Sequence, residues 1–208
     1  GDVLLKLNRP DEALASCERA LELRPDYATA HNNRGNALGH LKRHEEALAS
    51  YDRALQYRPD YPEAHNNRGI VLSDMKRHAE AVASFKRALQ LKPDYPEAIN
   101  LLGHALLKLK QYDDAVMTFA QLNDVAPDFD GARGNLLDAK LQCCDWTDYE
   151  PAIDEIDALV ADGKQPIGTF SYLAISAIPE LQLRCAAKYS AGRYAAVSAR
   201  LWDGQRYQ

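Results

Sequence analysis

The amino-acid sequence predicts an all-α protein in which pairs of helices repeat along the chain and stack into a superhelical solenoid. The first observation is that segment 28–61 recurs 34 residues later as 62–95, with 21 of 34 positions identical. The second is that apolar residues within a copy recur at spacings of three and four, as Ala47, Tyr51 and Ala54 do. That spacing is typical of amphipathic helices, and no segment shows the alternation of a strand. Units of this size bury their apolar faces only against neighbouring units.

Each copy is predicted to contain two antiparallel helices. Pro62 and Pro96 suit the first turn of a helix and are expected to begin the first helices of their copies. Pro59 and Pro93 lie just beyond the second helices, where the fixed φ and the missing N–H end a helix. The chain therefore alternates first and second helices at a constant period.

The period divides the chain into a repeat region at 1–143 and a helical C-terminal extension at 144–208. The repeat region is predicted to hold a partial repeat at 1–27, full repeats at 28–61, 62–95 and 96–129, and a degenerate repeat from 130. The extension is predicted to hold helices at 151–161, 170–177 and 179 to about 201, after a linker at 163–166. Because Gly1 falls at the eighth position of a repeat, we expect the chain to open partway through a first helix.

Three marker positions recur in phase through these repeats. Glycine stands at the eighth position, alanine at the twentieth and proline at the thirty-second: Gly35, Gly69 and Gly103; Ala13, Ala47, Ala81 and Ala115; Pro25, Pro59, Pro93 and Pro127. With the 34-residue period, this pattern resembles the tetratricopeptide repeat. The resemblance implies a tetratricopeptide-repeat solenoid whose first helices line a concave surface that binds polypeptides.

Composition and charge exclude several other classes. The net charge of −5, from 25 Lys and Arg against 30 Asp and Glu, disfavours a strongly basic nucleic-acid binder. A composition that is 46% hydrophobic and 26% charged is that of a globular protein. Apolar runs of a few residues are too short for a membrane span, which needs about 20. Four scattered cysteines fit reduced thiols, so we expect a cytoplasmic protein with no disulfide framework.

The segment after the last repeat carries a more specific signal. Cys144-Asp145-Trp146-Thr147-Asp148-Tyr149 follows the degenerate repeat and precedes an amphipathic helix. This junction resembles that of O-linked N-acetylglucosamine transferases and their bacterial and plant Spindly-type relatives. The resemblance implies a substrate-recognition arm of a protein O-glycosyltransferase whose catalytic domain, with its UDP-GlcNAc or GDP-fucose site, is not in this chain. We expect no enzymatic activity or nucleotide-sugar binding from the chain itself. The alternative is a stand-alone scaffold whose extension caps the last repeat.

Asparagines on successive first helices are the candidate partner-binding residues. The set comprises Asn32, Asn33, Asn66, Asn67, Asn100 and Asn135. Asparagine is a poor residue for a helix interior, so its recurrence suggests a use. In the transferase family a ladder of such amides holds the backbone of bound polypeptide, since an amide both donates and accepts hydrogen bonds. The sixth position, held by Asn33, Asn67 and Asn135, is expected to face the groove, and Leu101 interrupts the series. The alternative is that the amides bond one another between repeats.

Other chemistry-bearing residues favour structural roles. His40 and His44 have a four-residue spacing, but the repeat phase places them on different helices, so we expect no metal site. Cys143 and Cys144 are adjacent and are expected to stay unpaired. Acidic pairs at second-helix starts complement the helix dipole and form no acid–base dyad. No phosphate-binding glycine loop is present, so no cofactor is expected.

Two arginines depart from the family pattern. Arg34 and Arg68 stand at the seventh position, where the tetratricopeptide family usually has leucine. Because a buried, unpaired guanidinium is costly, we expect each to run its stem along apolar neighbours and to bring its head group to an acceptor near the repeat boundary. Asp60 and Asp94 are the predicted partners.

Overall fold

The structure is a computed structural model that describes residues 9–193, and every regular element within that range is a helix. The all-α prediction is therefore confirmed. The chain divides into two compact units, Gly1–Ala126 and Pro127–Gln208. The partial first helix predicted at the N-terminus and the predicted helix end near residue 201 lie outside the described residues. Within the described range, no helix is long and apolar enough to cross a membrane.

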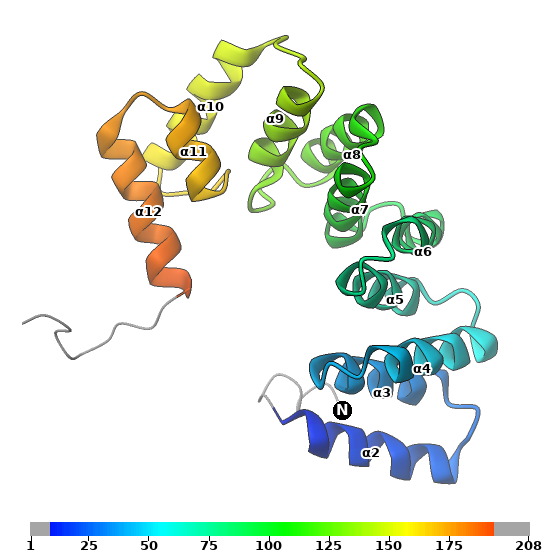
Figure 1. Cartoon of the computed structure of the whole chain (residues 1–208). Coiled ribbons are helices and arrows are strands. Elements are labelled where there is room, and N and C mark those ends of the chain that lie inside the picture. The colour runs from blue at the N-terminus through cyan, green and yellow to red at the C-terminus, as the bar shows by residue number, and fades with distance from the viewer. Residues whose placement is uncertain (1–8, 194–208) are drawn as a thin grey trace, which may run out of the picture. The chain divides into compact units, whose positions relative to one another are not determined.

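The described part of the first unit is a stack of seven helices (Figure 1). They are α2 (Pro10–Leu23), α3 (Ala28–His40), α4 (His44–Tyr57), α5 (Pro62–Asp74), α6 (His78–Leu91), α7 (Pro96–Lys108) and α8 (Tyr112–Val125). The first helices α3, α5 and α7 each pack on the second helix of their own repeat and on that of the preceding repeat. The predicted starts at Pro62 and Pro96 and the separation of His40 from His44 are confirmed.

The turn between the two helices of a repeat has the same geometry at each period. Lys42, Lys76 and Lys110 have φ of 60°, 61° and 59°, and the N–H of the next residue donates to a carbonyl five residues before it at 2.9–3.0 Å. Cys144 repeats this conformation with φ of 58°, and the Asp145 N–H donates to Lys140 O at 2.9 Å. The repeat geometry thus persists as far as Asp145, where the sequence phase ends.

Close packing within each full repeat depends on glycine at the eighth position. A Cβ built on Gly69 would lie 2.6 Å from the ring of Phe85, which is fully buried. At Gly35 and Gly103 the same Cβ would lie 2.5 Å from the rings of Tyr51 and Phe119. Real Cβ contacts are longer than this, so glycine lets an aromatic ring from the second helix reach the backbone of the first.

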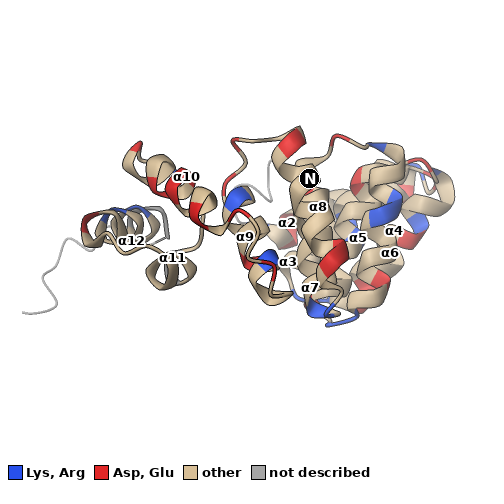
Figure 2. Cartoon of the chain, turned by 90° about the horizontal axis from the view of Figure 1, so that it is seen from above, with Lys and Arg blue, Asp and Glu red and all other residues tan. Residues whose placement is uncertain are grey.

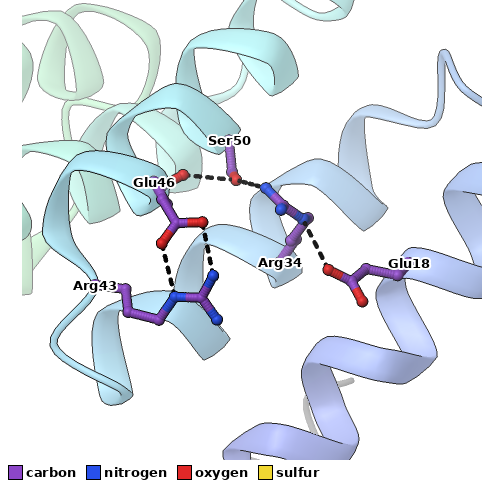
Figure 3. Close-up of polar contacts among 5 residues, drawn as sticks. All are labelled: Glu18, Arg34, Arg43, Glu46 and Ser50. Atoms are coloured by element: carbon purple, nitrogen blue, oxygen red, sulfur yellow. Dashed lines mark hydrogen bonds and ion pairs between the residues drawn. The ribbon is translucent and has the colours of Figure 1, made fainter.

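The two unusual arginines bridge three helices, and their predicted partners were wrong. Arg34 Nη1 donates to Ser50 Oγ at 2.7 Å, and its Nε lies 3.7 Å from Glu18 Oε1 on α2 (Figure 3). Arg68 donates through Nη1 to Ser84 and through Nε to Asp52 Oδ1, both at 2.8 Å. The carboxylate partners are Glu18, in an ion pair, and Asp52, in a hydrogen bond, both on the preceding second helix, in place of Asp60 and Asp94. Helix packing brings that helix closer to the arginine than the loop that the sequence suggested.

This bridge gives a charge-swap prediction. One period after Asp52 and Arg68 the sequence has Lys86 and Leu102, so the next repeat carries lysine and leucine at these two positions. Asp52→Lys is expected to destabilise the fold by about 1 kcal/mol, because it sets two cations side by side in a half-exposed site. Arg68→Leu added to that variant should restore part of the loss, since it recreates the natural Lys and Leu combination. Urea denaturation of the two single variants and the double variant measures this coupling. Additive losses would contradict it.

As far as residue 193, the second unit contains four helices around its own core. They are α9 (Ala132–Gln142), α10 (Tyr149–Ala161), α11 (Thr169–Ile175) and α12 (Pro179–Arg193). Buried residues from all four helices and the linker form the core: Leu137, Ile156, Val160, Ile167, Tyr172 and Cys185. The first helix of the degenerate repeat, α9, therefore lies in the same compact unit as the extension. The predicted helices of the extension match α10, α11 and the described part of α12 within two residues at their N-termini.

The linker before α11 closes the N-terminus of α9. The N–H of Gly131 donates to Gln165 O at 3.2 Å, and the N–H of Gly134 donates to Pro166 O at 2.9 Å. A Cβ on Gly134 would lie 2.7 Å from the Cα of Ile167. Carbonyls of the linker thus satisfy free N–H groups of the helix start, which ties the extension to the last repeat.

Candidate functional site

The six candidate asparagines all lie on first helices. Asn32 and Asn33 belong to α3, Asn66 and Asn67 to α5, Asn100 to α7 and Asn135 to α9 of the second unit. Asn32 and Asn66 are each only 4% exposed, whereas the other four are half-buried. In the first two full repeats the fifth position thus turns into the packing and the sixth is partly exposed, whereas Asn100, at the fifth position of the third, stays half-buried. This difference arises because neighbours on a helix point about 100° apart.

A hydrogen-bonded amide chain joins the first two full repeats. Asn67 Nδ2 donates to Asn32 Oδ1 at 3.1 Å, and Asn32 Nδ2 donates to Asn33 Oδ1 at 3.3 Å. The bonding between repeats that the sequence left as an alternative is therefore present here. It uses one atom of each outer amide, and leaves Asn33 Nδ2 as a donor and Asn67 Oδ1 as an acceptor for a ligand.

The amide chain stops where Leu101 interrupts the series. By the 34-residue period, the donor to Asn66 Oδ1 would come from position 101. Leucine has no donor, and Asn66 Oδ1 is buried without a hydrogen-bond partner among the described residues. The amide chain is thus a local feature of α3 and α5.

A hollow of about 380 Å³ lies between α3 and α5 beside the amide chain. It is lined by Asn36, Gly39, His40, Lys42, Tyr51, Asn67, Ile70, Val71 and Asp74. Of these residues only Asn67 was a sequence candidate. Asn36 could have been found, because it stands one helical turn after Asn32 and Asn33 and so shares their face. The others reach the hollow through the packing of α5 on α3.

The floor of the hollow is held by a buried tyrosine. The hydroxyl of Tyr51, which is 2% exposed, donates to Asn36 Oδ1 at 2.8 Å. Burial raises the pKa of Tyr51 well above its usual value, so the phenol stays protonated. Because Tyr51 occupies Oδ1, the amide nitrogen of Asn36 is the atom left to face a ligand.

Two histidines hold first helices to the preceding loop. His31 Nε2 contacts Pro25 O at 2.8 Å, and His65 Nε2 contacts Pro59 O at 3.1 Å. Since a carbonyl only accepts, each of these nitrogens carries the proton. The histidines therefore have a structural role at the fourth position. Among the described residues, no three His, Cys, Asp or Glu side chains come together as a metal site.

The environment of His65 predicts a pH dependence of stability. Burial lowers the pKa of His65 below its ordinary 6.5; the hydrogen bond with Pro59 O opposes this shift, and the positive charges of Arg87 and Arg68 add to it. The folded state then binds fewer protons than the unfolded state, so this contribution is complete above pH 6.5 and is lost as the pH falls through that value. The melting temperature is expected to be lower at pH 5.5 than at pH 7.5, with a smaller difference in His65→Gln. An NMR titration that places the pKa of His65 above 6.5 would contradict this.

Charges on the surface are mixed in sign. Figure 2 shows Lys and Arg interspersed with Asp and Glu over α4 and α6, and acidic residues following one another along α10. Surface pairs such as Arg43 with Glu46 and Arg77 with Glu80 neutralise one another at 2.7 Å. The helices drawn there carry no long basic stripe of the kind that tracks a nucleic-acid backbone.

Family models match most of the chain. One model described as "Tetratricopeptide repeat" matches residues 1–62 and 43–96, and a second model with the same description matches residues 72–146. Together they span the first unit and continue through α9. A search of curated proteins finds no match.

Solved structures share the fold at low sequence identity. MamA from Desulfovibrio magneticus RS-1 has a TM-score of 0.70 and 20% identity over 77% of this chain and 91% of its own. YrrB, described as a TPR protein with an unusual peptide-binding site, has a TM-score of 0.64 and 22% identity over 89% of this chain and 88% of its own. The first TPR of Spaghetti (RPAP3), bound to the HSP90 peptide SRMEEVD, has a TM-score of 0.55 and 20% identity over 56% of this chain and 93% of its own.

Proposed function

This chain belongs to the tetratricopeptide-repeat family over residues 1–146, and from that premise we propose that it binds an extended segment of a partner polypeptide along α3, α5 and α7. The observation that carries the proposal is the hollow between α3 and α5 with the amides of Asn36 and Asn67 in its wall. The Asn36 nitrogen offers a donor and Asn67 Oδ1 an acceptor, which are the complements of the carbonyl and the N–H of a peptide bond.

The remaining features of this surface favour polypeptide over other partners. Its amides can form hydrogen bonds with a peptide backbone of any sequence. Its rim carries one cation, Lys42, and one anion, Asp74. A balanced rim gives no strong preference for a polyanion such as nucleic acid. Related solenoids give independent support, since YrrB is described with a peptide-binding site and the RPAP3 repeat was solved with a bound peptide.

Substitutions in the amide chain test this function. Dodecapeptides selected from a random display library against the chain provide ligands for affinity measurement. Asn33→Ala is expected to weaken their binding about 2- to 12-fold, which corresponds to one net hydrogen bond of about 0.5–1.5 kcal/mol. Asn67→Ala should weaken binding as well. Both variants should also lower the free energy of unfolding by about 1–3 kcal/mol, because Asn67→Ala leaves the buried Asn32 Oδ1 without its donor and Asn33→Ala leaves Asn32 Nδ2 without its acceptor.

A matched control lies on the other helix layer. Gln56 is an exposed polar residue of α4, and Gln56→Ala is expected to leave binding unchanged. The proposal fails if the library yields no binder, or if the binders are indifferent to both Asn33→Ala and Asn67→Ala.

We further propose that the chain is the substrate-recognition arm of a protein O-glycosyltransferase. The support is the resemblance of Cys144–Tyr149 to the junction of that family. In this chain the junction is a turn in which Asp145 Oδ1 accepts from the Thr147 N–H at 2.9 Å, and the rings of Trp146 and Tyr149 meet edge to face at 5.3 Å. The alternative is a stand-alone scaffold.

The parent gene separates these two readings. A nucleotide-sugar-binding domain encoded after Gln208 would support the transferase, and a stop codon would support the scaffold. In either case, calorimetric titration of this chain with UDP-GlcNAc or GDP-fucose is expected to show no saturable binding. Micromolar binding would contradict the expectation that the nucleotide-sugar site lies outside this chain.

A further inference from the structure

Gly39 stands out from the other glycines of the repeats because nothing in the packing requires it. Its φ lies outside the positive range, and a Cβ built on it would meet only Val71 Cγ2, at an ordinary 3.6 Å. At Gly35 and Gly69 the same atom would overlap an aromatic ring. Glycine inside a helix is destabilising relative to alanine. The last turn of α3 therefore contains a destabilising residue that no packing contact requires.

What Gly39 does provide is open space. It lines the hollow between α3 and α5, and any larger side chain there would project into it. The residues one and two periods later are Ser73 and Leu107, so the opening is particular to this repeat. A glycine that costs stability and keeps one hollow open points to a ligand group that enters there.

The lining identifies the chemistry of that group. Ile70, which is 36% exposed, and the side chain of Val71 give the hollow an apolar wall, and Tyr51 gives it an aromatic floor. A bare glycine backbone opposite this wall suits a flat ring, and aromatic pairs gain beyond the area they bury. Lys42 and Asp74 stand at the rim with opposite charges, so the hollow gives no net electrostatic preference for a charged side chain of either sign.

We propose that the hollow at Gly39 is a specificity pocket that takes an aromatic side chain of the bound polypeptide. This inference rests on the proposed function and deepens it. The amides of Asn36 and Asn67 hold the backbone on either side of the ring, and the pocket selects the residue. The groove thus combines backbone contacts that accept many peptide sequences with one pocket that selects an aromatic side chain.

The dodecapeptide library tests the pocket through the composition of the selected ligands. We expect an aromatic residue to be enriched at one position, and its replacement by alanine to weaken binding at least tenfold. Gly39→Leu should weaken the aromatic ligands at least tenfold and leave their alanine-substituted versions unchanged, because it fills the pocket. Gly39→Ala should raise the melting temperature. Ser73→Leu, at the equivalent position of the next repeat, is the matched control and should leave binding unchanged.

The outcomes separate the pocket from the function. Ligands that bind without aromatic enrichment, or that tolerate Gly39→Leu in a folded protein, would overturn the pocket and leave polypeptide binding standing. A library that yields no ligand would overturn both. Circular dichroism of Gly39→Leu establishes its folding, and Gly39→Met offers a second, more adaptable filler that must show the same loss.

Discussion

Phe85→Ala is expected to lower the free energy of unfolding by about 3–5 kcal/mol. The ring of Phe85 is fully buried and lies against the backbone of Gly69. Because glycine has no side chain, nothing on the facing helix can relax into the space that the ring leaves. In a stacked array each repeat is stabilised by its neighbours, so the loss should also broaden the unfolding transition. Urea denaturation followed by circular dichroism measures both effects.

A second substitution makes this expectation sharper. Gly69→Ala in the parent chain should destabilise by about 1–3 kcal/mol, because its Cβ overlaps the ring. In the Phe85→Ala background the same change should stabilise, since it refills part of the cavity and improves helix propensity. Met117→Ala, at a residue that is 65% exposed on α8, serves as the control and should change little. Equal effects of Gly69→Ala in both backgrounds would refute this account of the packing.

Gly134→Ala is expected to disrupt the packing of α9 on the linker that precedes α11. The new Cβ would lie 2.7 Å from the Cα of Ile167 and 2.5 Å from its Cγ1, so backbone as well as side chain must move. Moving the linker also breaks the bond from the Gly134 N–H to Pro166 O. We expect a loss of about 3 kcal/mol or more, the upper end of the range for overpacking, since Ile167 belongs to the core of the second unit.

Hydrogen exchange resolves this effect by region. Amides of α10 and α11 should lose protection in Gly134→Ala, while those of α4 and α5 in the first unit keep theirs. Gly168→Ala is the control, because Gly168 has φ of −66° and no atom within 4 Å of the added Cβ. Unchanged protection in α10 and α11 would show that the linker does not hold the extension.

The helical architecture could be predicted because its signals are local and repeated. Pro62 and Pro96 begin α5 and α7, as the sequence predicted. The turn conformation seen at Lys42 recurs at Cys144, close to the point where the 34-residue period ends in the sequence. Each repeat is specified by short-range spacing, and four copies in phase reduce the ambiguity of any one of them.

Contacts between helices were harder to predict. Arg34 and Arg68 were expected to find acceptors near the repeat boundary, but their carboxylate partners are Glu18 and Asp52 on the preceding second helix. The sequence shows that Gly39, unlike the marker glycines, does not recur in later repeats, but only the packing of α5 on α3 shows that it lines a hollow. Both features depend on which side chains of neighbouring helices face one another, and the spacing within one helix does not determine this.

By itself, the amino-acid sequence determined the helices, their pairing and the repeat family, because a 34-residue period and its marker residues act within a single unit. Only the tertiary structure decided which amides bond each other and where the surface is hollow. Asn32 and Asn33 are adjacent in sequence, yet Asn32 is buried and bonded to Asn67 while Asn33 is partly exposed. The reason is physical: a rotation of 100° between neighbours separates core from surface, and the distance between α3 and α5 sets which atoms meet.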